Sequence, residues 1–128
     1  ACRRRLGTHL LAELLQCSKE ILDDEALIEK TLKKAAETAE LQIVGVSTHR
    51  FEPQGISSIV IVKESHISIH TWPEYGYAAV DIFVCKGKPF KALRFIVGTF
   101  SPKQVEVTRI GRGIGVEKKA SSWKLAYR

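Results

Sequence analysis

The chain has 128 residues, of which 45% are hydrophobic and 27% charged, and its formal net charge is +6. This length suffices for one hydrophobic core and is short for two. Nine glycines and four prolines are too few for a collagenous or low-complexity chain, and no apolar run approaches the roughly 20 residues that span a bilayer. The composition therefore excludes fibrous, disordered and membrane-spanning classes and predicts one globular domain with no membrane partner.

The positive charge lies at the two ends of the chain. Residues 1–5 contain three arginines, and residues 101–128 contain seven lysines and arginines against two acidic residues. The ten basic and twelve acidic residues that remain give residues 6–100 a net charge of −2. We therefore expect solvated basic ends rather than a basic folded face, and no nucleic-acid partner.

The three cysteines, Cys2, Cys17 and Cys85, are widely spaced and form no Cys-x-x-Cys pair. This spacing argues against a structural zinc site. An odd number of cysteines, together with the lack of a signal-like apolar stretch near residue 1, predicts a reducing, cytoplasmic setting.

The first two elements differ in how clearly the sequence defines them. Leu6–Cys17 fits two patterns: helix propensity favours a helix, although alternate residues also share one face of a strand. Asp23–Ala39 is a clear helix, because acidic residues stand at its start, where the helix dipole favours negative charge. Its apolar stripe is formed by Leu27, Ile28, Leu32, Ala35 and Ala36.

The middle of the chain alternates β-branched or period-two segments with turns and polar breaks, a pattern typical of strands. Turns are expected where proline and glycine occur together, as in 51–55 and 73–76. The four expected strands cover residues 41–49, 56–62, 66–72 and 77–85.

A second helix is expected at Phe90–Phe100, and Val105 and Val107 mark a last short strand. Residues 111–128 contain three glycines and a basic run without a period, which predicts a flexible basic tail. Short links between strands favour antiparallel pairing. The predicted fold is α+β: a single domain over residues 1–110, built as a two-layer sandwich of a mainly antiparallel sheet with two helices on one face.

Residues suited to catalysis concentrate between His49 and Cys85, a segment that holds three of the four histidines. His66 and His70 would share one face of a strand, and Asp81 or Cys85 could complete a metal site with them. Half-buried histidines that pair with the backbone or with carboxylates explain the same pattern. We favour this second interpretation and expect no metal.

Two further residues admit a plain and a functional interpretation. Ser65 beside His66 does not form a hydrolase dyad, because adjacent strand residues point to opposite faces and no Gly-x-Ser-x-Gly elbow surrounds the serine. A serine at a strand break is more often a turn residue. Cys85 ends an apolar strand, where cysteine is most often a small buried residue. Alternatively, its thiol could donate a proton, since thiols are largely protonated at neutral pH.

The string KESHISIHTWPEYGYAAVDIFV at residues 63–84 resembles the core of the short prokaryotic S-adenosylmethionine decarboxylase proenzymes. The resemblance continues through 7–10, 49–51 and Cys85, and it covers roughly residues 6–112. It implies an α+β fold in which residues 6–14 form a strand. It also implies a homodimer of αβ pairs with the active sites at the subunit interface.

Members of this family make their cofactor, a pyruvoyl group, from their own chain. By this resemblance, the Glu64–Ser65 bond cleaves itself when the Ser65 hydroxyl attacks the Glu64 carbonyl. The products would be a β chain, residues 1–64, and an α chain, residues 65–128, with the pyruvoyl group at the position of Ser65. That group would form a Schiff base with the substrate amine and accept the electrons left when CO₂ departs.

The resemblance also implies roles for individual residues. His70 and Ser57 match the residues that assist processing, and Cys85 matches the acid that protonates the substrate α-carbon. Phe51 matches an aromatic residue that stacks on adenine. Glu74 matches the carboxylate that holds the ribose hydroxyls.

The implied reaction is decarboxylation of S-adenosylmethionine to the aminopropyl donor for spermidine synthesis. An arginine decarboxylase on the same scaffold is an alternative. Phe51 and Glu74 favour the nucleoside, because arginine has neither a base to stack nor a ribose to hold. The segment 86–89 looks shorter and more basic than the corresponding loop of the family, a difference that could alter how the substrate reaches the site.

Two alternatives come from other classes of protein. An unprocessed, non-catalytic relative would use its basic tails to bind polyanions, in a manner that depends strongly on salt. A hydrolase or metal enzyme would use His66, His70 and Cys85, and it would show no internal cleavage.

Overall fold

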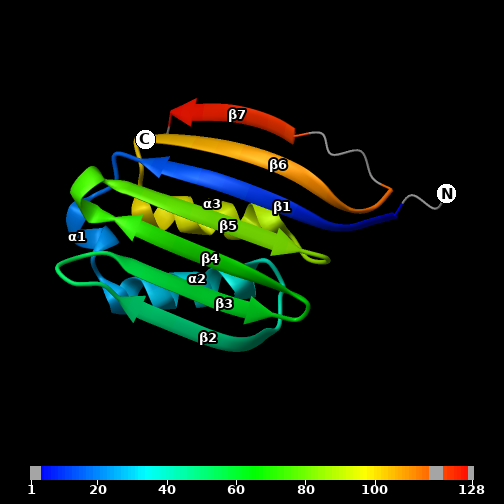
Figure 1. Ribbon diagram of the computed structural model, residues 1–128, viewed down its shortest axis with the longest axis horizontal. Coiled ribbons are helices and arrows are strands. Elements are labelled where there is room, and N and C mark those ends of the chain that lie inside the picture. Colours follow the sequence, from blue (N-terminus) through cyan, green and yellow to red (C-terminus); the bar gives the residue numbers. More distant parts are fainter. Residues whose placement is uncertain (1–3, 116–119, 127–128) are drawn as a thin grey trace.

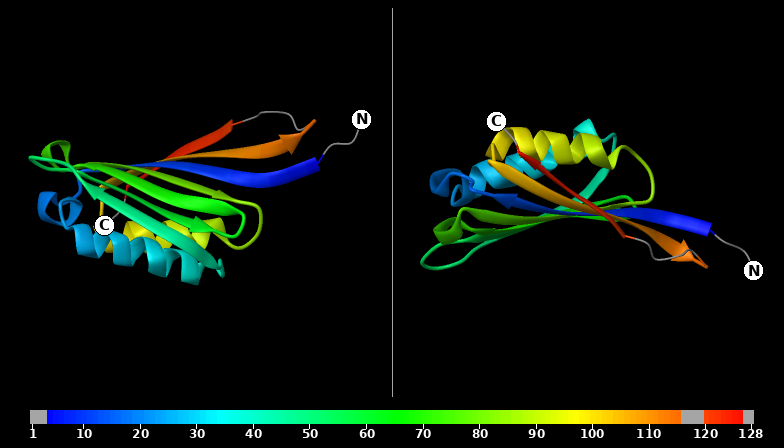
Figure 2. Two further views of the ribbon diagram at one scale, coloured as in Figure 1. Left: turned by 60° about the horizontal axis from the view of Figure 1, so that its bottom comes forward. Right: turned by 90° about the horizontal axis from the view of Figure 1, so that it is seen from above.

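The computed structural model describes residues 4–115 and 120–126. In this part of the chain, seven strands form one antiparallel sheet, and the helices form a second layer against one of its faces (Figures 1 and 2). The strands are β1 (Arg4–Leu15), β2 (Ile43–Arg50), β3 (Ile56–Val62), β4 (Ser65–Trp72), β5 (Tyr77–Val84), β6 (Gln104–Ile114) and β7 (Ala120–Ala126). The helices are α1 (Lys19–Leu22), α2 (Glu25–Thr38) and α3 (Pro89–Phe100), and a 3-10 turn, η1 (Pro73–Tyr75), follows β4.

The strand order is β2-β3-β4-β5-β1-β6-β7, and every neighbouring pair is antiparallel. β2 to β5 follow one another as a meander, whereas β1 lies between β5 and β6. Because β4 and β5 run in opposite directions, the first residue of β4 lies beside the end of β5, where His66 pairs with Phe83. This register brings together residues that are far apart in the sequence.

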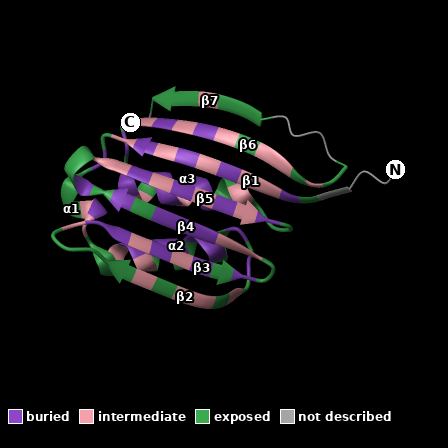
Figure 3. Cartoon of the chain, viewed as in Figure 1, coloured by how far each residue is buried: buried purple, intermediate pink, exposed green. Residues whose placement is uncertain are grey.

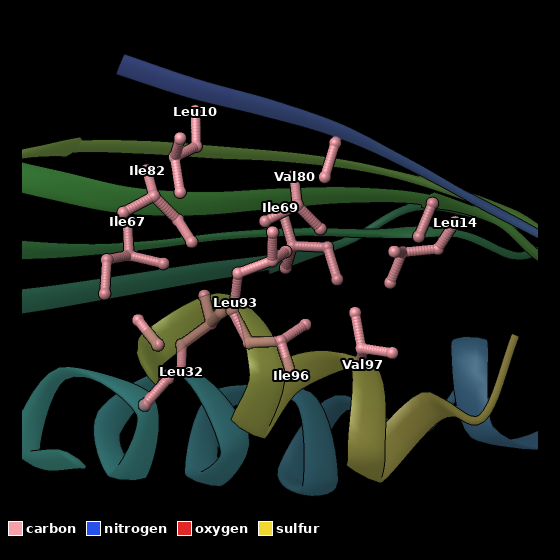
Figure 4. Close-up of a cluster of buried hydrophobic side chains, with 14 of the residues drawn as sticks. Leu10, Leu14, Leu32, Ile67, Ile69, Val80, Ile82, Leu93, Ile96 and Val97 are labelled. Carbon is pink, nitrogen blue, oxygen red and sulfur yellow. The ribbon is translucent and has the colours of Figure 1, made fainter. Parts of the chain in front are cut away.

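The hydrophobic core lies between the sheet and the two long helices. The Asp24 side chain begins α2 by accepting a hydrogen bond of 3.0 Å from the Leu27 N–H, and Pro89 occupies the first turn of α3. Burial of each large aliphatic side chain stabilises the folded state by about 1.5–3 kcal/mol relative to leaving that side chain exposed. Figure 4 shows the strand side chains that meet those of α2 and α3; the labelled residues are Leu10, Leu14, Leu32, Ile67, Ile69, Val80, Ile82, Leu93, Ile96 and Val97.

Within the described residues, no helix covers the opposite face of the sheet, which we call the open face (Figure 2). Strand alternation places on this face the side chains between the core positions. In β4 and β5 these are largely polar, and most are half-buried or exposed (Figure 3). They include His66, Ser68, His70, Asp81 and Phe83.

The predicted fold class is confirmed: the structure is an antiparallel sheet with two long helices on one face. The helix that propensity favours at residues 6–17 is wrong, because this segment forms most of β1, as the resemblance implies. Leu10, Ala12 and Leu14 are buried in the core. Pairing with β5 on one side and β6 on the other overrides the local preference for a helix.

A separate tail at residues 111–128 is also a wrong prediction for the described residues. β6 continues to Ile114, and β7 pairs with it between Gln104↔Ala126 and Ile110↔Ala120. The domain boundary expected at residue 110 therefore falls inside a strand. Trp123 packs against the core and stacks on Phe90 with ring centroids 6.1 Å apart. Residues 116–119 and 127–128 of the expected tail lie outside the described residues.

None of the helices described is long and apolar enough to cross a membrane.

Candidate active site

The first group of candidate residues lies where β4 begins. A tight turn of Lys63 and Glu64 joins β3 to β4 and places Ser65 at the first position of the strand. Cys85 follows the last residue of β5, so the antiparallel register carries it to the same place. Ser65 and Cys85 are therefore neighbours although 20 residues separate them.

The contacts in this group converge on one peptide bond. The Ser65 hydroxyl donates to the Glu64 carbonyl oxygen at 2.6 Å, and the Cys85 N–H donates to Ser65 Oγ at 3.1 Å. Cys85 Sγ lies 3.6 Å from Ser65 Oγ and 3.7 Å from the Glu64 oxygen. The hydroxyl thus lies against the carbonyl that it would attack, and the thiol lies near the oxygen on which negative charge would develop.

The structure corrects the interpretation of Cys85 as a small buried residue, because Cys85 is exposed. Cys17 is the buried cysteine, with 8% of its surface exposed, and burial raises the pKa of its thiol to about 11. The two thiols therefore have different environments, and the exposed one adjoins the Glu64–Ser65 bond.

The second group lies at the opposite end of β4. His70 pairs with Ser57 of β3, and its Nδ1 is 2.7 Å from Ser57 Oγ. Both residues line a shallow hollow of about 270 Å³ on the open face, together with His49. The His49 ring makes an edge contact with Phe51, with centroids 4.6 Å apart.

Phe51 opens the loop between β2 and β3 at this same end of the sheet, with 47% of its surface exposed. Its N–H donates to the Gly55 carbonyl at 2.8 Å. Asp23 accepts hydrogen bonds from the Gly55 N–H and the Arg50 guanidinium, at 3.1 and 2.9 Å. The Gly55 hydrogen bond and the Arg50 contact lower the pKa of Asp23, so an ionised carboxylate holds the loop in place.

The predicted site residues thus divide into two groups. His70 lies five residues after Ser65 in β4, and five residues of a strand span about 16 Å. Glu74 is exposed and belongs to η1, which directly follows the last residue of β4, so it lies at the His70 end of that strand. One group contains Glu64, Ser65 and Cys85, and the other contains Phe51, Ser57, His70 and Glu74. Within one chain the structure does not bring the two groups together.

The residues considered as metal ligands have other partners. Asp81 contacts His9, with 3.0 Å between the carboxylate and Nε2, and Cys85 contacts Ser65. Within residues 4–115 and 120–126, no three histidine, cysteine or acidic side chains gather in a way that could hold a metal ion.

Sequence reasoning missed a cluster around Phe83 on the open face. The His9 and His66 rings flank Phe83, with centroids 5.6 and 6.1 Å away. The Arg112 guanidinium carbon lies 4.8 Å from the centre of the Phe83 ring. Gly7 is the signal that could have found this cluster, because a glycine inside a strand often marks close approach of another group.

The structure is a small two-layer α+β domain with a candidate enzyme site, in which a serine hydroxyl lies against the preceding carbonyl oxygen and a thiol lies beside both. Comparison with known proteins supports this assignment. Residues 8–113 match the family described as S-adenosylmethionine decarboxylase. The chain belongs to the S-adenosylmethionine decarboxylase family, which confirms both the resemblance found in the motif and the prediction of a decarboxylase-family enzyme.

Individual relatives match over most of their length. The S-adenosylmethionine decarboxylase proenzyme of Moorella thermoacetica is 47% identical over 113 residues, which cover 87% of this chain and 90% of the relative. That of Clostridium kluyveri is 46% identical over 122 residues, which cover 91% and 97%.

Solved structures resemble the chain as well. The crystal structure of the Aquifex aeolicus adenosylmethionine decarboxylase has a TM-score of 0.83 at 33% identity, with 91% of this chain and 98% of that chain covered. A monomer of the Trypanosoma brucei enzyme has a TM-score of 0.63 at 16% identity and shares the fold alone. The match covers 80% of this chain and 45% of the trypanosomal one.

Proposed function

We propose that this chain cleaves itself between Glu64 and Ser65 and then decarboxylates S-adenosylmethionine with the pyruvoyl group formed at Ser65. Family membership supports the substrate and the reaction. The observation that carries the proposal is the contact of 2.6 Å between the Ser65 hydroxyl and the Glu64 carbonyl oxygen, with the Cys85 thiol alongside.

Cleavage begins when Ser65 Oγ attacks the Glu64 carbonyl carbon, so that the acyl group moves from nitrogen to oxygen. A base then removes the α-proton of Ser65, and the bond between Cβ and Oγ breaks, which frees the Glu64 carboxylate. The dehydroalanine left at position 65 takes up water and loses ammonia, which leaves the pyruvoyl group. The small Ser65 side chain and its contacts with Cys85 fit this sequence of steps.

The residues assigned to proton removal are too far away to act within one chain. His70 and Ser57 are hydrogen-bonded to each other at the other end of β4, about 16 Å from Ser65. We infer that a second copy supplies them. If two open faces pack in opposite directions, the His70 end of one sheet covers the Ser65 end of the other.

The open face supports such a homodimer. Ile61 and Phe51 expose 48% and 47% of their surface at its two ends. Polar side chains that could pair across an interface, such as His66 and His70, lie between them. Each site then combines Ser65 and Cys85 of one copy with the partner's second group.

When formed, the pyruvoyl carbonyl supplies the sink for the electrons left by CO₂. Cys85 donates the proton to the substrate α-carbon, and its exposed position beside Ser65 supports this role. The exposed Phe51 ring stacks on adenine, and Glu74 holds the ribose hydroxyls. The product is the aminopropyl donor for spermidine, made in the cytoplasm, where free thiols such as Cys17 and Cys85 persist.

A product assay tests this assignment. Purified protein is incubated separately with S-adenosylmethionine and with arginine, and the CO₂ and amine products are measured. We expect turnover of S-adenosylmethionine, because arginine has no base that could stack on Phe51 and no ribose that Glu74 could hold. Turnover of arginine alone would contradict the proposed substrate, and turnover of neither would contradict the decarboxylase activity.

A further inference from the structure

Phe83 forms a rigid platform on the open face. Its ring lies directly against the backbone of β1: a Cβ atom at Gly7 would come within 2.5 Å of the ring edge. The His9 and His66 rings flank it on two further sides. His9 is itself held by Asp81 at 3.0 Å. The ring therefore has little freedom to move, and its remaining face is available to another group.

Arg112 occupies that face. It pairs with Gly7 across β1 and β6, and its guanidinium carbon lies 4.8 Å from the ring centre. Among the described residues, no carboxylate lies within 4.0 Å of this guanidinium, since Asp81 binds His9 instead. Leu6, Phe83, Arg112 and Gly113 line a hollow of about 270 Å³ here. Within the part of the chain that the structure describes, the platform thus presents a positive charge without an acidic partner beside this hollow.

This charge adjoins the Ser65 group. Phe83 lies in β5 and Cys85 just after its last residue, two positions further along the chain, a separation of about 7 Å. His66, which follows Ser65, pairs with Phe83 in the sheet. A substrate joined through its amine at position 65 carries its α-carboxylate on the carbon next to that amine. The carboxylate is therefore confined to the neighbourhood of Ser65, Cys85 and the platform.

We propose that Arg112, held on Phe83, binds the α-carboxylate of the substrate. This inference rests on the proposed function in taking an amino acid as substrate. Arginine is suited to the role, because its planar fork matches a carboxylate with two parallel hydrogen bonds. The ion pair is lost when the carboxylate departs as CO₂. Arg112 thus favours substrate over product and adds about the same binding energy to the ground state and to the transition state, in which the carboxylate has not yet departed.

The test compares two ligands that differ in the carboxylate. Steady-state kinetics give kcat and KM for S-adenosylmethionine and the inhibition constant of decarboxylated S-adenosylmethionine. The variants are Arg112→Gln, which removes the charge, and Arg112→Lys, which keeps the charge without the fork. Arg109→Gln is the matched control, because it removes an exposed arginine from the opposite face of the same strand. Intact mass and elution volume establish that cleavage and oligomeric state are unchanged.

We expect Arg112→Gln to raise KM by roughly 10- to 100-fold and to leave kcat and the product inhibition constant nearly unchanged. Arg112→Lys gives a smaller rise, and the control variant leaves all three constants unchanged. A KM and a product inhibition constant that rise together, or that both stay constant, would overturn the inference, because a merely structural role treats both ligands alike.

The outcome is distinct from a failure of the proposed function. If the natural protein does not turn over the substrate, the decarboxylase proposal fails, and equilibrium dialysis of the same two ligands still decides the role of Arg112. Selective loss of binding of the carboxylate-bearing ligand in Arg112→Gln would support the inference. A natural protein that binds neither ligand would overturn it.

Discussion

At the scale of single residues, the two described cysteines differ in their surroundings. Cys85 is exposed and contacts both Ser65 and the Glu64 carbonyl, whereas Cys17 is buried in the core cluster. Sequence alone favoured burial for Cys85, because an apolar strand precedes it. The structure places it one residue beyond the strand and in register with Asp81 and Phe83 on the open face, whereas the preceding Val84 is buried.

We predict that Cys85→Ala still cleaves to some degree but loses turnover by about 10²- to 10⁴-fold, the usual contribution of a positioned proton donor. Cleavage is followed by intact mass and turnover by CO₂ release. Cys17→Ala serves as the control, with turnover near that of the natural protein. Undiminished turnover in Cys85→Ala would remove the thiol from the role of acid.

The raised pKa of Cys17 predicts a pH-dependent stability. The unfolded thiol ionises near pH 9, whereas burial keeps the folded one protonated up to a pKa of about 11. Between these values the unfolded state releases a proton that the folded state retains, so the free energy of unfolding falls by about 1.4 kcal/mol per pH unit. Urea denaturation at pH 8 and pH 10 measures this loss. The loss should be smaller in Cys17→Ala, and an equal loss in both proteins would contradict the assignment.

At the scale of elements, β1 depends on a glycine at its crossing with Phe83. A side chain at Gly7 would displace the Phe83 ring or the β1 backbone, since its Cβ would lie 2.5 and 2.8 Å from two ring carbons. We predict that Gly7→Ala lowers the free energy of unfolding by about 1–3 kcal/mol. Gly45→Ala is the matched control, because among the described residues no atom other than those of Gly45 and its two chain neighbours lies within 4 Å of the position its Cβ would take. Equal effects of the two substitutions on the urea midpoint would contradict this account.

The elements also show what the sequence can and cannot predict. The period of Asp23–Ala39 and the alternation in β4 and β5 define those elements locally, and the motif around Ser65 identifies the family. β1 and β7 could not be predicted from local preference. A Leu-rich segment becomes a strand only because β5 and β6 pair with it, and Trp123 and Leu125 provide too short an alternation by themselves. The meeting of Ser65 with Cys85 likewise depends on the register of β4 and β5.

At the scale of the whole molecule, the two groups of site residues lie at opposite ends of β4, and the proposed function joins them through a second copy. Co-expression of two defective chains tests this arrangement. Ser65→Ala retains His70, and His70→Ala retains Ser65, so a mixed dimer contains one site with all of its residues. We predict that the His70→Ala chain is cleaved faster in the mixture than alone, as measured by the masses of differently tagged chains. Cleavage no faster in the mixture would show that His70 does not act across an interface.

We propose that the chain makes its own cofactor by breaking the Glu64–Ser65 bond, and every later step depends on this cleavage. The most direct test is the mass of the purified protein under denaturing conditions, with Ser65→Ala as the uncut reference. We predict two fragments, residues 1–64 and residues 65–128, and the second should be lighter by one ammonia than a chain that begins with serine. A single uncut chain after prolonged warm incubation, or a second fragment that begins with an intact serine, would contradict the claim.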